Sequence, residues 1–183
     1  MDEITIDIGC GTAKHPKARF GVDRLLLPEV DYVCDFEVDR LPFDDSSVDA
    51  VYTRHTLEHV RNLQHLLSEI IRVAKPGASV NVLVPHFSNP LAYSDPTHVR
   101  FFGYFTFDYF SKQKDPRWWV PSYTSDIWFR IASKRYNFKN LSVLGPLIEW
   151  VFNREGFLPY FYESKLSWFI PCSELAFELV VEK

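Results

Sequence analysis

The chain has 183 residues, of which 46% are hydrophobic and 24% charged, a balance typical of a soluble globular protein. The formal net charge of −4 argues against a protein whose main task is to coat nucleic acid, and no apolar run approaches the ~20 residues of a membrane-spanning helix. Three widely spaced cysteines, Cys10, Cys34 and Cys172, indicate reduced thiols rather than a disulfide framework or a zinc cage. Residues 1–9 lack the features of a signal peptide, so we expect a cytoplasmic protein.

Short strand-like runs rich in Ile and Val dominate the first half of the chain. The predicted strands span 3–9, 18–23, 31–36, 47–55 and 79–86. Apolar residues at helical spacing predict a helix over 56–77, which the Pro-Gly pair at 76–77 closes. Strands that alternate with helices or short connections predict an α/β fold in which a largely parallel sheet has layers on both faces.

The second half has a different composition. Sixteen of the 30 Phe, Trp and Tyr residues fall within 86–138, and the segment 86–136 is predicted to be an insertion that caps a substrate site. Beyond it, the pattern predicts a strand over 137–145, a helix over 146–153 and a terminal strand over 173–183. Residues 1–183 are expected to form one domain.

Charge is also unevenly distributed. Residues 1–60 hold 13 Asp and Glu against six Lys and Arg, whereas residues 112–139 hold seven Lys and Arg against two Asp. Basic residues interleaved with aromatics can bind RNA or an anionic membrane surface. The 112–139 segment is more simply explained as a solvated edge of the cap, with the binding role kept as the alternative.

A glycine loop follows the first predicted strand. The run "IDIGCGTAKH" places Gly9 and Gly11 at the strand end, where glycine allows a tight turn and close approach of a ligand. Asp23 closes the second strand, where a carboxylate can accept hydrogen bonds from ribose hydroxyls. Asp35 and Phe36 close the third strand and offer an acceptor and an aromatic face for an adenine.

The short connection behind this loop distinguishes between two nucleotide cofactors. NAD needs a helix N-terminus to balance the charge of its pyrophosphate. Pro16 and the few residues before the next strand leave room for little more than one turn of helix. S-adenosylmethionine (SAM) carries no phosphate and can bind without a helix N-terminus, so the sequence favours SAM over NAD.

Residues 4–86 as a whole resemble the class I SAM-dependent methyltransferases of the type 11 group. The resemblance rests on ordered motifs, "DIGCGTAKHPKARFGVDR", "LPFDDSSVDAVYTRHTLEHV" and "RVAKPGASVNVLVP". It implies a seven-stranded mixed sheet of order 3-2-1-4-5-7-6 with the last strand antiparallel. It also implies that Asp7 contacts the methionine end of SAM, and it assigns the loop, ribose and adenine roles to Gly9, Gly11, Asp23, Asp35 and Phe36. Ala13 stands where the family has a third glycine.

The stretch "YTRHTLEHV" contains His55, Glu58 and His59 in the H-x-x-E-H pattern of a zinc peptidase. A zinc helix needs both histidines on one face of a continuous helix. Because the predicted strand ends at His55 and the helix begins at Thr56, we expect no metal site here. His55 is instead expected at the rim of the cofactor pocket, with Glu58 and His59 as residues of a helix start.

Candidate catalytic and acceptor-binding residues lie in the stretch "PHFSNPLAYSDPTHVRFF". His86 and His98 are candidate general bases for a hydroxyl acceptor, although His98 could equally be a turn residue bonded to Asp95. Arg100 could bind an acidic group of the substrate or form a structural ion pair. Phe101 and Phe102 could cover the acceptor or pack in the core.

Together these features predict a SAM-dependent methyltransferase. Its acceptor is expected to be a small molecule or a glycan- or lipid-linked molecule, methylated at oxygen, with nucleic acid an improbable partner and peripheral membrane contact open. The alternatives are a SAM-binding partner protein without catalysis and an RNA-directed methyltransferase that uses the 112–139 segment.

Overall fold

The computed structural model of the protein describes residues 3–113, 120–121, 123, 127–139, 141 and 143–183. Within them the strands are β1 (Thr5–Ile8), β2 (Phe20–Asp23), β3 (Tyr32–Val33), β4 (Val48–Arg54), β5 (Ala74–Pro85), β6 (Phe129–Asn137) and β7 (Glu174–Val181). The α-helices are α1 (Leu63–Val73), α2 (Pro90–Ser94), α3 (Gly145–Phe152) and α4 (Leu158–Phe161). Two 3₁₀ turns, η1 (Leu57–His59) and η2 (Thr106–Phe110), and a π-helical turn, η3 (Tyr162–Leu166), complete the structure.

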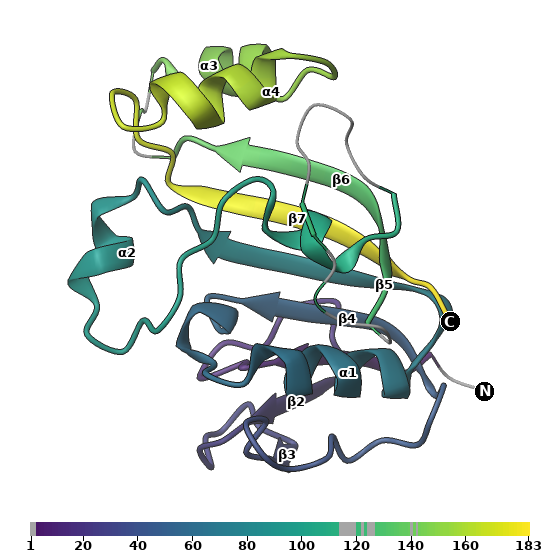
Figure 1. Cartoon of the computed structure of the whole chain (residues 1–183). Helices are drawn as coiled ribbons and strands as arrows, with labels where there is room; N and C mark the ends of the chain where they lie inside the picture. The colour runs from purple at the N-terminus through teal and green to yellow at the C-terminus, as the bar shows by residue number, and fades with distance from the viewer. Residues whose placement is uncertain (1–2, 114–119, 122, 124–126, 140, 142) are drawn as a thin grey trace.

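All these strands form one seven-stranded sheet of order β3-β2-β1-β4-β5-β7-β6 (Figure 1). Strands β1 to β5 pair in parallel, and β7 runs antiparallel to both β5 and β6. The predicted strand order and the antiparallel last strand are therefore confirmed. The carboxyl ends of β1, β2 and β4 consequently meet at one edge of the sheet, where α/β proteins bind ligands.

The boundaries differ from prediction at three elements. The strand predicted over 79–86 begins at Ala74, so the Pro-Gly pair at 76–77 lies within β5 and does not close the helix. The helix predicted over 56–77 is divided into η1 and α1, because Asn62 accepts a hydrogen bond from the His65 amide and starts a new helix there. The strand predicted over 137–145 is wrong, since β6 occupies Phe129–Asn137. Basic residues fill much of this edge strand, and they made it resemble a solvated loop rather than part of a sheet.

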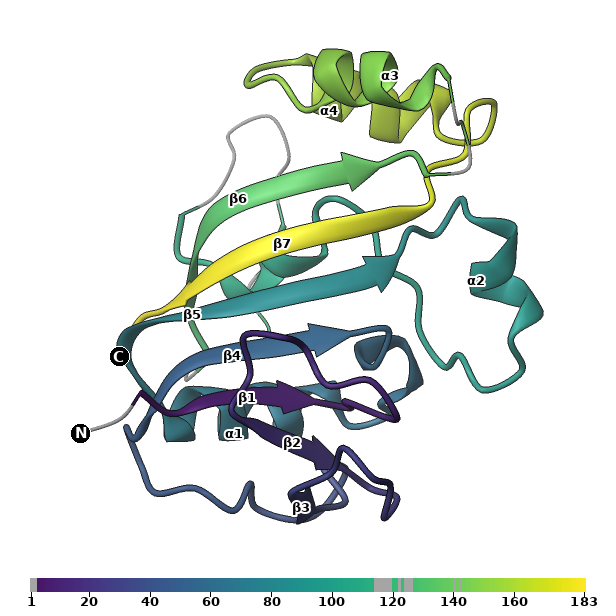
Figure 2. The ribbon, with the colours of Figure 1, turned by 180° about the vertical axis from the view of Figure 1, so that it is seen from behind.

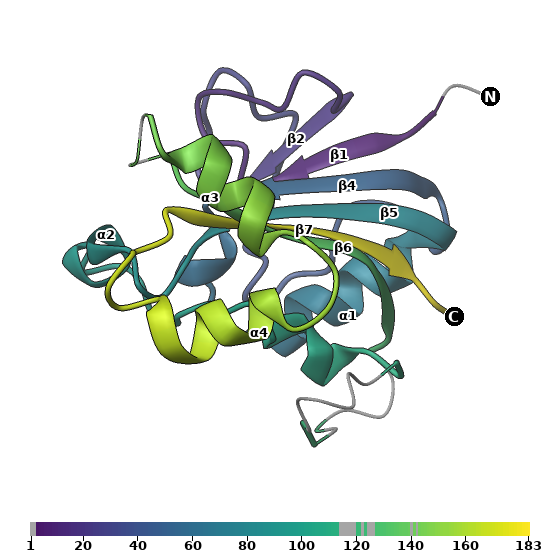
Figure 3. The same ribbon diagram turned by 90° about the horizontal axis from the view of Figure 1, so that it is seen from above.

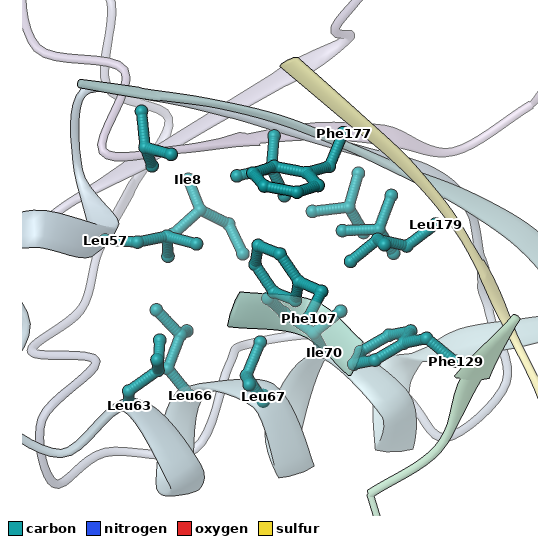
Figure 4. Packing of buried hydrophobic residues seen from close by; sticks show 14 of the residues in the cluster. Ile8, Leu57, Leu63, Leu66, Leu67, Ile70, Phe107, Phe129, Phe177 and Leu179 are labelled. Carbon is teal, nitrogen blue, oxygen red and sulfur yellow. The ribbon is translucent and has the colours of Figure 1, made fainter. Parts of the chain in front are cut away.

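The hydrophobic core lies between the sheet and α1. Helix α1 buries its apolar side chains against the sheet, and aromatic residues from η2 and β6 fill the space beside it (Figure 4). Phe102 and Phe107 are fully buried in this core. Part of the predicted cap therefore forms the core itself, because side chains this large gain most from removal from water.

The opposite face of the sheet is largely open. The connections after β1, β2 and β3 contain no helix within the described residues, so the prediction of layers on both faces is wrong. Figures 2 and 3 show α1 on one side of the sheet and, on the other, the loop after β1 near the first strands and α3 at the β6 edge. Side chains such as Tyr52, Asn81 and Glu178 make this face polar, and they line a shallow depression there. None of the described helices is long and apolar enough to cross a bilayer.

Candidate functional site

A cavity of about 500 Å³ opens at the carboxyl ends of β1, β2 and β4. Five of the residues predicted to bind cofactor line it, namely Gly9, Asp23, Asp35, Phe36 and His55. The remaining lining residues are Arg24, Glu37, Thr56, His59, Val60, Arg61, Pro96, Thr97 and Val99. One end of the cavity thus carries the predicted nucleotide-binding groups, while η1 and the segment after α2 also contribute to its wall.

The loop after β1 is held in the shape that its two glycines allow. Gly9 and Gly11 have φ angles of +72° and +55°, in the left-handed region that favours glycine. The Gly9 amide donates to the carbonyl of Val22 at 2.8 Å. Thr56 packs so closely on Gly9 that a Cβ there would lie 2.1 Å from the Thr56 hydroxyl oxygen. This contact fixes the loop against the start of η1.

We expect Gly9→Ala to destabilise the protein by about 2 kcal/mol, because it combines an unfavourable φ with a collision. Gly77→Ala is the matched control: Gly77 also has a positive φ of +82°, but its Cβ would meet nothing within 4 Å. That control should cost about 1 kcal/mol from backbone strain alone. Urea unfolding of both variants measures the difference, and equal losses would show that the Thr56 contact is unimportant.

Asp23 lines the cavity and organises the loop. Its carboxylate accepts hydrogen bonds from the amides of Gly11 at 3.0 Å and Leu25 at 3.0 Å. Gly11 itself does not line the cavity; it acts through this bond. A carboxylate oxygen has two lone-pair directions, so Asp23 can hold the loop and still accept a hydrogen bond from a ligand.

Asp35 and Phe36 stand at the end of the third strand, beside the cavity. Asp35 accepts from the Glu37 amide at 3.0 Å, and Phe36 is buried with 7% of its surface exposed. Glu37, which the sequence interpretation missed, accepts from the amides of Arg61 and Asn62 at 2.6 and 2.7 Å. These bonds join the third strand's loop to the residues that precede α1, and so fix the width of the cavity.

Asp7, predicted to contact the methionine end of SAM, is not among the residues that line the cavity. It is 1% exposed and lies beneath the glycine loop rather than among the residues that line the cavity. Its carboxylate accepts from the His15 amide at 2.7 Å and lies 3.6 Å from the Arg54 guanidinium. Burial raises the pKa of this carboxyl, and the His15 bond and Arg54 oppose that shift. In this position Asp7 holds the end of the loop after β1 through the His15 amide, a role that does not require contact with a cofactor.

His55 ends β4 in a strained conformation with a φ of +52°. Its Nε2 lies 3.2 Å from Glu174 and its Nδ1 lies 3.5 Å from Glu58. Hydrogen bonding to Glu174 and Glu58 raises the pKa of His55 to about 9, against the effect of burial. The same contact lowers the pKa of Glu174 to about 2. His55 is therefore an imidazolium at neutral pH, which excludes it as a general base.

A pH titration tests this charge. A folded-state pKa of about 9 exceeds the unfolded value of about 6.5, so the stabilisation is complete below about pH 6.5 and is lost as pH rises through 9. His55→Asn removes the charge, and asparagine tolerates the positive φ. We expect the free energy of unfolding of the native chain to fall over this range and that of His55→Asn to remain flatter; parallel curves would contradict the assignment.

The predicted bases His86 and His98 have different surroundings. His86 is fully buried, its Nδ1 accepts from the Ser88 amide at 3.1 Å, and its Nε2 therefore carries the proton that it donates to Glu163 at 2.9 Å. With both ring nitrogens engaged and no place in the cavity wall, His86 does not fit the predicted role of a base. His98 lies between the cavity-lining residues Thr97 and Val99, and its Nδ1 donates to the carbonyl of Ala92 at 2.9 Å.

The predicted substrate residues do not line the cavity. Arg100 donates from Nε and Nη2 to the carbonyls of Val60 and Arg61, so its guanidinium braces the residues after η1. Phe102 is 1% exposed and belongs to the core. Phe101 is half exposed and stacks on Tyr93. These three residues were assigned to the substrate site because they lie close to His98 in the sequence. In the structure none of the three side chains lines the cavity.

His59 and Thr97 line the cavity and were not predicted to do so. The His59 Nδ1 lies 2.9 Å from the hydroxyl of Thr97, and that hydroxyl donates to Asp95 at 2.6 Å. The rings of His59 and His98 meet edge to face at 4.7 Å. The motifs H-x-x-E-H and D-P-T-H were visible in the sequence, but nothing local indicated that they would meet.

The fold and this cavity at the strand ends define a class I methyltransferase architecture. Residues 4–82 match the family model described as a methyltransferase domain. A demethylmenaquinone methyltransferase of Renibacterium salmoninarum is 31% identical over 101 residues, which cover 48% of this chain but only 41% of that relative.

Solved structures share the fold over the whole chain. The complex of the Haloferax volcanii Trm112 methyltransferase activator with a methyltransferase matches with a TM-score of 0.59 and 16% identity, covering 99% of this chain and 83% of that one. Phosphoethanolamine N-methyltransferase 2 of Haemonchus contortus, in complex with SAM, matches with a TM-score of 0.59 and 16% identity. The match covers all of this chain, 100%, and 49% of that protein.

Proposed function

We propose that the protein transfers the methyl group of SAM to a hydroxyl of a small or a glycan- or lipid-linked acceptor. The observation that carries this proposal is the convergence of Gly9, Asp23, Asp35 and Phe36 on one cavity. In the proposed complex the Asp23 carboxylate accepts hydrogen bonds from the ribose, and the adenine lies by Asp35 and Phe36.

The loop after β1 supports SAM over a dinucleotide. No helix follows Gly11 before β2 begins at Phe20, so the loop offers no helix dipole to a pyrophosphate. SAM places a sulfonium, not a phosphate, in this region. Methyl transfer itself needs mainly positioning of the nucleophile and exclusion of water, which suits a cavity whose wall is built from several fixed segments.

The other end of the cavity, formed by His59, Pro96, Thr97 and Val99, is the proposed acceptor site. His98 adjoins it and remains a candidate to assist loss of the acceptor proton, since its Nδ1 donates to Ala92 and its Nε2 keeps a lone pair. A lone pair of this kind suits an oxygen nucleophile, which must lose a proton during transfer.

An exposed apolar surface supports a lipid-linked acceptor. Four aromatic side chains are each more than half exposed, with Phe169 at 83%: Trp150, Phe157, Trp168 and Phe169. Trp150 lies in α3, Phe157 directly precedes α4, and the other two lie in the segment before β7; α3 and α4 lie beyond β6 (Figure 1). Aromatic side chains of this kind insert at the interface of a bilayer. The 112–139 segment, with its proposed RNA or membrane role, falls partly outside the described residues.

Calorimetric titration with SAM, S-adenosylhomocysteine and NAD tests the cofactor. We expect the first two to bind in the micromolar range and NAD not to bind; absence of SAM binding would overturn the proposed function. Co-sedimentation with anionic phospholipid vesicles tests the acceptor class. Binding should be lost in Trp168→Ser/Phe169→Ser and kept in Leu26→Ser, which removes an equally exposed residue elsewhere. Failure of the native chain to bind vesicles would leave a small soluble acceptor.

A further inference from the structure

Three potential metal ligands meet at the acceptor end of the cavity. Glu58 and His59 belong to η1, and His98 lies in the segment that follows α2. One ligand atom from each of them lies within 4.8 Å of the others. Two of these residues come from the H-x-x-E-H pattern, but His98 takes the place of His55, which is bound to Glu174.

Glu58 is a buried carboxylate with an unused oxygen. Only 1% of its surface is exposed, its Oε1 lies 3.5 Å from His55, and its Oε2 has no hydrogen-bond partner among the described residues. Leaving a buried charged oxygen unpaired is costly. A cation bound at Oε2 would remove this cost.

The neighbouring hydrogen bonds fix both histidines in the tautomer that a metal requires. The Thr97 hydroxyl gives its single proton to the Asp95 carboxylate, which can only accept, so it must accept from the Nδ1–H of His59. His98 donates its Nδ1–H to the carbonyl of Ala92. Each ring is left with its lone pair on Nε2, which in His98 lies 3.8 Å from the Asp95 carboxylate. Bonds of this type from the far nitrogen orient histidines that ligate metals.

We propose that Glu58, His59 and His98 bind a divalent transition metal ion through the carboxylate and the two Nε2 atoms. Ligands about 2.1 Å from a tetrahedral zinc lie about 3.4 Å apart, so the three groups reach this geometry with side-chain shifts of about 1 Å. Imidazole nitrogens favour zinc, copper, iron or nickel over magnesium. The expectation of no metal site, drawn from the H-x-x-E-H pattern alone, concerned His55 and not His98.

The ion would keep at least one position open toward the cavity, because His59 lines the cavity and the protein supplies three ligands. In this respect the inference deepens the proposed function: the open position would take the acceptor hydroxyl, and its coordination would lower the pKa of that hydroxyl. With the Nε2 of His98 bound to the ion, the ion and not the His98 lone pair would assist loss of the acceptor proton. Binding of the ion itself does not depend on methyl transfer.

Metal titration of the full chain tests the proposal. The protein is treated with a chelator, dialysed and titrated with Co²⁺ and Zn²⁺, with the visible Co²⁺ absorption and calorimetry as readouts. We expect one equivalent to bind with tetrahedral or five-coordinate Co²⁺ bands, which Zn²⁺ displaces. Glu58→Gln and His98→Asn should each weaken binding at least 100-fold, and Thr97→Val, which removes a support of His59, about 10–100-fold.

His65→Asn is the control, since His65 lies on α1 and its Nε2 bonds the carbonyl of Asp39. It should bind cobalt as the native chain does. Circular dichroism identifies any variant that fails to fold, and His59→Gln then serves in its place. Lack of cobalt binding by the native chain, or unchanged affinity in the ligand variants, would overturn the proposal. S-adenosylhomocysteine binding in the same samples shows separately whether the proposed function holds.

Discussion

Replacement of Asp23 by alanine is expected to weaken SAM binding by about 100-fold. The variant loses the proposed hydrogen bonds between the Asp23 carboxylate and the ribose. It also loses the hydrogen bond of 3.0 Å that the Gly11 amide donates to Asp23. Hydrogen bonds to a charged group contribute about 1.5–3 kcal/mol each, so loss of the ligand contact together with loosening of the loop reaches this magnitude. Calorimetric titration with S-adenosylhomocysteine measures it.

Two variants separate the contributions of Asp23. Asp23→Asn keeps the side-chain shape and can still accept from the Gly11 amide, so it should lose only the charge, about 10-fold in affinity. Asp44→Asn, an exposed carboxylate outside the cavity, should bind normally. An Asp23→Ala variant with native affinity would show that the ribose does not lie at this strand end.

Replacement of Glu163 by glutamine is expected to lower the free energy of unfolding by about 4 kcal/mol. The Glu163 carboxylate accepts from His86 Nε2 at 2.9 Å, the Tyr136 hydroxyl at 3.0 Å and the Tyr104 amide at 2.7 Å. Glutamine turns one of these acceptor oxygens into a donor, so at least one buried donor would face another. Burial, with Glu163 beside it, raises the pKa of Tyr136 far above its usual value, so Tyr136 stays a donor.

The control for this variant is Glu155→Gln, because Glu155 is exposed and lies eight residues earlier in the same part of the chain. It should change stability by less than about 0.5 kcal/mol. Urea unfolding gives both values. A Glu163→Gln loss as small as that of the control would mean that the carboxylate is not the acceptor for these three donors.

The first half of the fold could be predicted because its signals are local. Apolar runs mark β1, β2 and β4, and parallel strands bring Gly9, Asp23 and Asp35 to one edge whatever the connections contain. Strand β6 could not be recognised, since β7 is its only strand partner among the described residues and its open face carries basic residues. For a strand at the sheet edge, the alternation of apolar and polar residues gives a weak signal.

The cavity wall was predicted at the strand ends that carry Gly9, Asp23, Asp35 and Phe36, and less well at the end formed by His59 and Thr97. His86 stands at a strand end as expected, but η3 brings Glu163 onto it from a distant part of the chain. His59 was interpreted as a helix-start residue from its local sequence. Its contacts with Thr97 and His98 arise only when the segment that carries these two residues packs against η1. Contacts between segments far apart in the sequence leave no periodic pattern to read.

The position of β7 between β5 and β6 has a consequence for how the chain folds. Ser79 of β5 pairs with Val180 of β7, and in the part of the chain that the structure describes β6 has no strand beside it except β7. During synthesis, β6 therefore leaves the ribosome with its pairing edges bare and must wait for residues 174–181 before it can join the sheet. Such long-range pairing slows folding and prolongs the exposure of Phe129 and other apolar side chains. In a cell this interval is when the chain would be most dependent on chaperones.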